Sequence, residues 1–280
     1  MVQRRGMGSS RGFGMGRIIV ALIMAGFAII SYLGTREENP YTGETQYIGI
    51  SREQEVAMGL QAAPQMAEEY GGLDQDADAQ AYLDQVCQKL IDNSVAAETD
   101  YPFECSLLAD PETINAFALP GGPVFITAAL FNRLQTEGQL AGVMGHEIGH
   151  VVARHSAQRI AKQQLTQGLT GAVVIASYDP DNPNSARTAQ MAALIGGLVN
   201  MSYGREDELE SDRLGVRFMA DAGYNPNAMV QVMEILAESS EGGGQPEFFS
   251  THPNPENRIA KIQEAIQTEF PDGLPGGLID

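Results

Sequence analysis

Apolar residues recur along most of this chain at spacings of three and four, which is the period of an α-helix with one buried face. The clearest segment is 76–93, whose apolar positions form a single stripe: Leu83, Val86, Cys87, Leu90 and Ile91. Two capping-box patterns, which begin at Ser51 and at Thr136, predict helices over about 51–70 and 136–164.

Three shorter segments between these helices have the composition of β-strands. They cover 103–109, 116–119 and 124–127. The last two are joined by Pro120-Gly121-Gly122-Pro123, a sequence typical of a tight turn. Helices are also predicted over 205–222 and 254–270. We therefore expect an α+β fold that is predominantly helical.

The N-terminus combines a basic segment with an uncharged apolar run. Residues 1–17 contain four arginines and no acidic residue, and residues 18–34 contain no charged residue. Seventeen helical residues span roughly 26 Å, slightly less than the ~30 Å hydrocarbon layer of a membrane. The small-x-small triplet Gly26-Phe27-Ala28 lies inside the run, where signal cleavage does not occur. We expect an uncleaved transmembrane signal anchor over 18–34.

The basic flank predicts the orientation of this anchor. By the positive-inside rule, residues 1–17 stay in the cytoplasm and residues 35–280 lie outside. Residues 35–50 are polar and are expected to form a linker. A cleaved secretory signal and a mitochondrial-type targeting segment remain alternatives.

Two further apolar stretches, 168–177 and 191–201, are too short to cross a membrane. We expect them to be buried core helices. Between residues 241 and 244 the sequence Glu-Gly-Gly-Gly predicts a flexible loop.

The charge of the chain excludes one class of function. Its 280 residues contain 17 Lys and Arg against 36 Asp and Glu, a net charge of −19. A nucleic-acid-binding surface needs clustered cations to contact phosphates, so we expect no nucleic-acid partner.

The two cysteines leave the redox compartment open. Cys87 falls on a predicted helix and Cys105 on a predicted strand, and they could pair in an oxidising compartment. Buried cysteines also serve as small apolar core residues, which is what we expect here. Their spacing resembles no zinc cluster.

The sequence His146-Glu147-Ile148-Gly149-His150 carries the chemistry. Two histidines four residues apart lie on one face of a helix, where both rings can reach one ion. Imidazole nitrogen suits Zn²⁺, and Glu147 points near the same metal without being needed as a ligand. We therefore predict a zinc site on the helix 136–164.

A catalytic zinc needs a third protein ligand and an open position. His155 follows His146 by nine residues, half a turn round a continuous helix, so we expect it to face away from the metal as a structural or solvent-facing residue. The acidic helix 205–222 is the natural source of a carboxylate ligand. Spacing alone does not choose between Glu206 and Glu208.

These motifs together resemble the CAAX-prenyl-protease-type zinc metallopeptidases, most closely the BepA- and LoiP-like bacterial branch and more distantly the HtpX-like branch. The resemblance covers about 50–270. It rests on His146–His150, on Glu208-Leu209-Glu210-Ser211-Asp212 some 58 residues later, and on the segments Asn115–Gly122 and Thr251-His252-Pro253. Ser211 stands where the family usually has Ala, a departure that leaves the ligands intact.

The resemblance implies a zincin-like (gluzincin) metallopeptidase domain over 51–270 with a small antiparallel sheet, followed by a tail over 271–280. It implies one Zn²⁺ per chain, held by His146, His150 and Glu208. Asp212 is then the carboxylate that accepts the N–H of a ligating imidazole.

The same resemblance implies roles around the metal. Glu147 is expected to act as the general base. His252 and Arg258 are candidate donors to the developing oxyanion, although His252 could instead occupy the open zinc position. The edge strand that receives an extended substrate would contain four residues: Asn115, Ala116, Phe117 and Ala118.

The expected function is that of a zinc-dependent endopeptidase in envelope protein quality control, with unfolded or envelope proteins as substrates. We expect a single-pass protein of the bacterial inner membrane whose catalytic domain lies in the periplasm, or a periplasmic protein if the signal is cleaved. The alternative is a chaperone-like or binding module with little proteolytic activity. The oligomeric state is left open.

Overall fold

The computed structural model describes residues 11–177, 203–241, 245–253 and 257–280. It divides the chain into two compact units. Within the described residues, one unit contains 11–37, 45–49 and 158–177, and the other contains 38–44, 50–157 and the residues from 203 onward. The expected stretch 191–201 and the expected loop 241–244 fall wholly or mostly outside the described residues.

The first unit contains the N-terminal helix α1 (Arg11–Gly34), the strand β2 (Thr45–Tyr47) and most of α6 (His155–Ser177). β2 pairs with β1 (Arg36–Glu38), so the expected linker 35–50 contains a small two-stranded sheet. The apolar run of α1, Met15–Gly34, is long and apolar enough to cross a membrane by length and composition. This finding agrees with the predicted anchor over 18–34.

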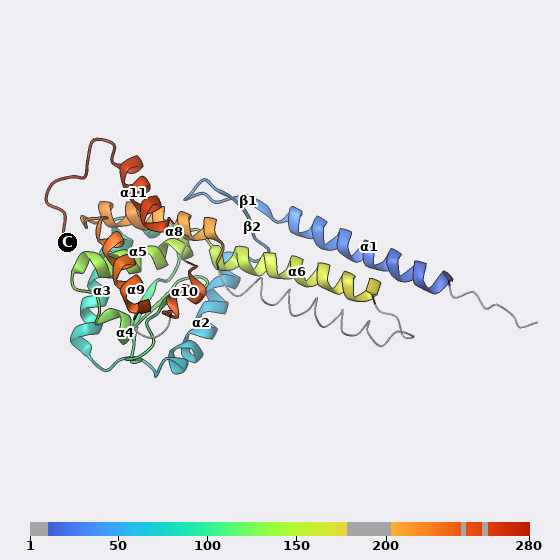
Figure 1. Ribbon diagram of the computed structural model, residues 1–280, viewed down its shortest axis with the longest axis horizontal. Helices are drawn as coiled ribbons and strands as arrows, with labels where there is room; N and C mark the ends of the chain where they lie inside the picture. Colours follow the sequence, from blue (N-terminus) through green and yellow to red (C-terminus); the bar gives the residue numbers. More distant parts are fainter. Residues whose placement is uncertain (1–10, 178–202, 242–244, 254–256) are drawn as a thin grey trace, which may run out of the picture. The chain divides into compact units, whose positions relative to one another are not determined.

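The second unit packs helices around a three-stranded sheet (Figure 1). The elements that precede the helix with His146 and His150 are α2 (Arg52–Glu69), α3 (Ala77–Asp92), the 3₁₀ turn η1 (Val95–Glu98), β3 (Glu104–Leu108), β4 (Ala116–Ala118), β5 (Pro123–Thr127) and α4 (Ala128–Phe131). That helix is α5 (Glu137–Val152), and after it this unit contains α8 (Arg205–Asp221), α9 (Ala228–Glu241), α10 (Phe248–Thr251) and α11 (Arg258–Glu269). The predicted α+β, predominantly helical fold is confirmed.

The three-stranded sheet is mixed. Its order is β3-β5-β4, with β3 parallel to β5 and β4 antiparallel to β5. The expectation of an antiparallel sheet was therefore correct for one of the two strand pairs. The long connection between β3 and β5, which contains β4, allows the parallel pairing that a tight hairpin would not.

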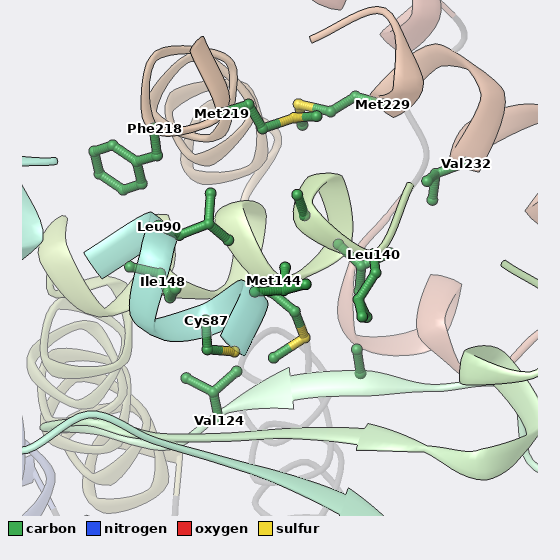
Figure 2. Packing of buried hydrophobic residues seen from close by; sticks show 14 of the residues in the cluster. Cys87, Leu90, Val124, Leu140, Met144, Ile148, Phe218, Met219, Met229 and Val232 are labelled. Atoms are coloured by element: carbon green, nitrogen blue, oxygen red, sulfur yellow. The ribbon is translucent and has the colours of Figure 1, made fainter. Parts of the chain in front are cut away.

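The core lies between this sheet and α8, with α5 in its centre. Every residue of α5 from Gly138 to Val152 is buried. Figure 2 shows side chains of α3, α5, α8 and α9 converging above the sheet, among them Leu90, Met144 and Met229. Burial on all sides holds α5 rigidly, which suits a helix that carries ligands.

Cys87 on α3 and Cys105 on β3 form a disulfide, which corrects the expectation that they are unpaired core residues. The buried stripe of α3 packs on β3 and brings the two Cα atoms to 6.6 Å, within the range that a disulfide spans. Sequence pattern places each residue on a buried face, but only the docking of helix on strand brings the two together.

The predicted helix 136–164 is also corrected, because the chain breaks into α5 and α6. Arg154 between them has a φ of 57°, in the left-handed region that ends a helix. The guanidinium of Arg154 is held by the buried carboxylate of Glu55 and donates to the carbonyl of Ile50 at 3.1 Å. This ion pair holds the chain at the point where it leaves the active-site helix.

Candidate active site

Glycines let α8 approach α5 closely enough to bring a carboxylate to the histidine pair. A Cβ on Gly149 would lie 2.8 Å from the Ser211 hydroxyl oxygen, and a Cβ on Gly215 would lie 3.2 Å from the backbone nitrogen of His146. The Ser211 hydroxyl donates to the His146 carbonyl at 2.6 Å and joins the two helices. Glu208, one turn before Asp212 on α8, consequently faces His146 and His150.

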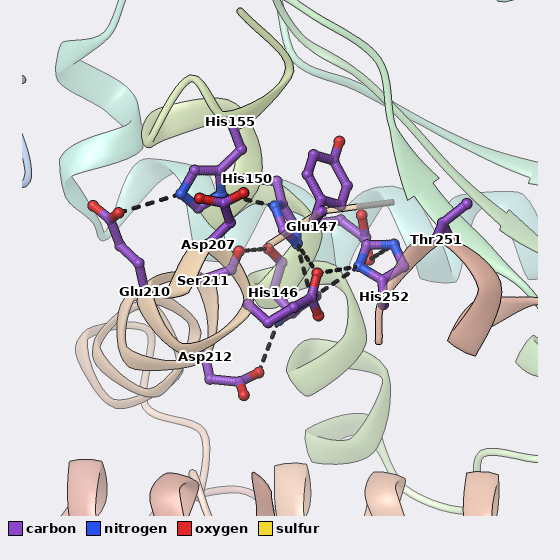
Figure 3. Close-up of polar contacts among 12 residues, drawn as sticks. His146, Glu147, His150, His155, Asp207, Glu210, Ser211, Asp212, Thr251 and His252 are labelled. Carbon is purple, nitrogen blue, oxygen red and sulfur yellow. Dashed lines mark hydrogen bonds and ion pairs between the residues drawn. The ribbon is translucent and has the colours of Figure 1, made fainter. Parts of the chain in front are cut away.

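The predicted metal ligands converge. His146 Nε2 lies 3.0 Å from His150 Nε2. Glu208 Oε2 lies 3.5 Å from the first of these nitrogens, and Glu208 Oε1 lies 3.4 Å from the second. His252 Nδ1 completes the group, 3.4 Å from His146 Nε2 and 3.1 Å from Glu208 Oε1. Figure 3 shows the histidine rings turned toward one another. All four side chains are buried.

These separations fit a zinc ion. Ligand atoms about 2.0–2.1 Å from a tetrahedral Zn²⁺ lie roughly 3.3 Å apart, and three nitrogens with one carboxylate are donors that zinc accepts. The five separations above all lie between 3.0 and 3.5 Å. Glu208 Oε2 has no hydrogen bond within the described residues although it is buried. The residues present therefore fit one zinc ion per chain.

The structure distinguishes Glu206 from Glu208, the two candidate ligands between which sequence spacing did not choose. Glu206 is exposed on the outer side of α8, whereas Glu208 is completely buried. Burial alone would raise the pKa of the Glu208 carboxyl, but His252, His146 and His150 hold that pKa well below its ordinary value. The carboxylate is therefore ionised and ready to bind a cation.

Asp212 and Arg258 lie behind the ligands. Asp212 Oδ1 is 2.9 Å from His146 Nδ1, which leaves His146 Nε2 to face the metal position. Arg258 on α11 donates twice to Asp212, at 2.9 Å each, and its Nη1 lies 3.2 Å from Glu208 Oε2. Burial alone would raise the pKa of Asp212, but Arg258 and His146 lower it. The guanidinium of Arg258 thus contacts the carboxylates of both Asp212 and Glu208.

His155 is a site residue that sequence reasoning missed. It is fully buried, its Nδ1 lies 2.8 Å from His150 Nδ1, and its Nε2 lies 3.3 Å from Glu210 Oε2 (Figure 3). The expectation that it faces away assumed one continuous helix. Because the chain turns at Arg154, His155 begins α6 and returns toward His150 instead. Nothing in the sequence indicates that Arg154 adopts the left-handed conformation that separates the two helices.

Tyr203 is a second contact of His150 that the sequence did not indicate. Its ring stacks on the His150 ring with centroids 4.1 Å apart. Its hydroxyl lies 3.1 Å from the Ser156 hydroxyl, and its backbone nitrogen donates to Thr251 at 3.1 Å. The tyrosine therefore joins the start of α6 to the end of α10 beside the ligands.

Glu147 has the surroundings of a proton acceptor. Its side chain is completely buried and neither carboxylate oxygen has a hydrogen bond within the described part of the chain. His252 Nε2 lies 3.6 Å from its Oε1. Burial raises the pKa of Glu147 above the ordinary glutamate value, which moves it toward the range useful for proton transfer near neutral pH.

The predicted substrate strand is the outer strand of its sheet by topology, but α10 is tied to its beginning. The backbone nitrogen of Phe248 donates to the Ile114 carbonyl at 3.2 Å. Glu247 accepts from the Tyr70 hydroxyl at 2.5 Å and from the Asn115 amide at 3.3 Å. All three residues of β4, Ala116, Phe117 and Ala118, are buried. The segment that carries His252 is thus attached at both the metal position and the strand.

Comparisons with known proteins place the chain in a family. A family model described as Peptidase family M48 matches residues 77–266. The beta-barrel assembly-enhancing protease of Escherichia coli strain K12 is 34% identical over 185 residues, 64% of this chain and 37% of that protein. Its counterpart in Yersinia pestis is 29% identical over 249 residues, 87% of this chain and 50% of that protein.

A eukaryotic protein also matches over most of the chain. The mitochondrial metalloendopeptidase OMA1 of Schizosaccharomyces pombe is 32% identical over 251 residues, 88% of this chain and 71% of that protein. The chain spans half or less of the length of the beta-barrel assembly-enhancing proteases cited above. Because the matched residues 77–266 make up more than half of the chain, the protein belongs to peptidase family M48.

Proposed function

We propose that this chain is a zinc-dependent endopeptidase. The observation that carries the proposal is the convergence of ligand atoms from His146, His150 and Glu208 within 4.8 Å of one another, with the buried carboxylate of Glu147 beside them. A zinc ion held there would polarise the scissile carbonyl and lower the pKa of a water molecule. The printed names of the relatives, protease and metalloendopeptidase, support the same activity.

The surrounding residues have separate roles in this proposal. Glu147 takes a proton from the attacking water and delivers it to the leaving amine nitrogen. Asp212 holds His146 in the tautomer that leaves Nε2 unprotonated, and Arg258 positions the carboxylates of Asp212 and Glu208. Arg258 also remains a candidate donor to the oxyanion once substrate enters.

His252 closes the site in this proposal. Its Nδ1 stands at ligand distance from both His146 Nε2 and Glu208 Oε1, so it would take the position that a substrate carbonyl needs. The sequence allowed two roles for His252, closure of the metal position and stabilisation of the oxyanion. Closure belongs to the state without substrate, and oxyanion stabilisation belongs to the state with substrate bound. The spacing of the described atoms favours closure, and an extended substrate would then pair with the strand Asn115–Ala118 after α10 moves away.

We propose unfolded or envelope proteins as the substrates. The name of the bacterial relatives links those proteins to β-barrel assembly, and main-chain pairing along a strand selects little for side-chain sequence. We also propose that α1 anchors the chain in a bacterial inner membrane, with the catalytic unit in the periplasm. The disulfide between Cys87 and Cys105 supports an oxidising compartment.

The Glu147→Gln variant tests the enzymatic proposal. The full chain, purified with zinc in lipid nanodiscs, is incubated with an unfolded model protein. We expect the variant to lose cleavage by about 10²–10⁴-fold, the usual contribution of a general base, while its zinc content stays at one per chain. No cleavage by either protein would favour the chaperone-like or binding alternative, and equal cleavage by both would refute Glu147 as the general base. Cleavage of small esters but not of peptides would point to another hydrolase.

A further inference from the structure

The second half of α6 differs from the buried core helix that its apolar composition suggested. No charged residue occurs from Gln163 to Ser177, whereas the first half carries Arg159 and Lys162. Of residues 168–176, whose side chains the structure describes, Ala172 is buried, and the others are partly or fully exposed. Val173 is 47% exposed. From Gly168 to Ser177 the polar side chains are those of Thr170 and Ser177, and such an accessible, mostly apolar helix face is unusual for a surface in water.

This half of α6 packs along α1 in the same unit. A Cβ on Gly168 would lie 2.7 Å from the Cβ of Ala28, so the two backbones approach very closely there. Three residues further on, a Cβ added to Gly171 would lie 3.7 Å from the Cε of Met24. The contacts run in opposite directions along the two helices, which are therefore antiparallel (Figure 1). A groove between them has mainly apolar walls.

If α1 crosses a membrane, the contacts between α1 and α6 indicate how deep in the hydrocarbon layer α6 would lie. Met24 precedes Gly34, where α1 ends, by ten residues, or about 15 Å along the helix axis. The hydrocarbon layer is ~30 Å thick, so a residue in contact with Met24 would lie near its middle. Gly171 is that residue, and α6 continues for six residues beyond it.

We propose that the second half of α6 is a membrane-embedded element that binds α1 on one side and lipid acyl chains on the other. This inference rests on the proposed membrane anchoring by α1. Acyl chains are the occupant that fits, because an uncharged helix at that depth contacts hydrocarbon wherever it does not contact α1. The Gly168–Ala28 approach is the kind of small-residue contact that joins helices in lipid.

A fluorescence-depth experiment tests the proposal on the full chain in vesicles of phosphatidylethanolamine and phosphatidylglycerol. An environment-sensitive dye is attached to a single introduced cysteine, because Cys87 and Cys105 are bonded to each other and buried. The position tested is Val173→Cys. Val20→Cys on the exposed face of α1 is the membrane control, and Glu238→Cys on α9 is the aqueous control.

We expect the dye at position 173 to shift to the blue and to lose fluorescence to lipids brominated in mid-chain, as the dye at 20 does. The dye at 238 should respond only to aqueous iodide. Iodide quenching at 173 with bromine quenching at 20 would overturn the proposal and leave the anchor intact. Shielding of 173 from both quenchers would also overturn it, because a protein partner would then cover α6. Iodide quenching at 20 would instead refute the anchor itself.

Discussion

The Nδ1 atoms of His150 and His155 lie 2.8 Å apart, and His155 Nε2 continues the contact to Glu210 Oε2 at 3.3 Å. A proton shared between the two Nδ1 atoms leaves His150 Nε2 free to bind a metal ion. In the proposed metal site, His155 would therefore support His150 as Asp212 would support His146.

We predict that His155→Ala weakens zinc binding. Loss of a residue that orients a metal-binding histidine typically costs 10–100-fold in affinity, so a decrease of that size is expected. Competition with a fluorescent chelator measures it. Lys162→Ala, on an exposed position further along α6, is the control and should bind zinc as the wild type does. Unchanged affinity in His155→Ala would show that His150 needs no such support.

We predict that Glu208→Ala abolishes stoichiometric zinc binding, whereas Glu206→Ala does not. The two glutamates lie on the same helix, but only Glu208 faces the histidines. Its removal takes away the one carboxylate among the four ligand candidates. Metal analysis after dialysis, together with the rise in melting temperature on zinc addition, measures the difference. Retention of one zinc per chain by Glu208→Ala would refute the assignment of the third ligand.

We predict that His252→Ala raises cleavage of unfolded protein. If His252 closes the metal position, its removal opens that position to substrate. If it were a donor to the oxyanion instead, its removal would lower kcat by about 10²–10³-fold. Steady-state kinetics with the full chain separate the two outcomes, and zinc content must be checked in parallel.

Tyr70→Phe is a companion variant that leaves the metal position untouched. It removes the hydroxyl that donates to Glu247 at 2.5 Å but keeps the ring contact with Phe117. Because Glu247 is exposed to solvent, this hydrogen bond contributes at most about 1 kcal/mol, so α10 should open a few-fold more often and cleavage should increase modestly. Unchanged kinetics in both Tyr70→Phe and His252→Ala would mean that α10 does not limit access.

We predict that reduction of the Cys87–Cys105 disulfide lowers the free energy of unfolding of the catalytic unit by roughly 3 kcal/mol, as expected for a closed loop of this size. Urea unfolding with and without reductant measures the change. The double variant Cys87→Ala with Cys105→Ala should be insensitive to reductant. Free thiols in the unreduced protein would contradict the prediction.

Local patterns in the sequence sufficed to predict where several helices begin and to place the two histidines of the candidate site on one helix face. Capping at Ser51 and Thr136, and the buried stripe of 76–93, depend on neighbours a few residues away, and the structure has those helices. The same holds for His146 and His150, because four residues on a helix place two side chains on one face whatever the rest of the chain does.

Tertiary structure decided what local spacing could not. Glu206 and Glu208 are equivalent in pattern until the close approach of α8 to α5 turns one of them inward. The break at Arg154 reverses the direction of His155, and it depends on an ion pair with Glu55, about a hundred residues away. The disulfide, the mixed sheet and the attachment of α10 likewise join distant segments. Helical periodicity is a property of neighbours in sequence, whereas the convergence of His146, His150, Glu208 and His252 is a property of packing, and only the folded chain determines it.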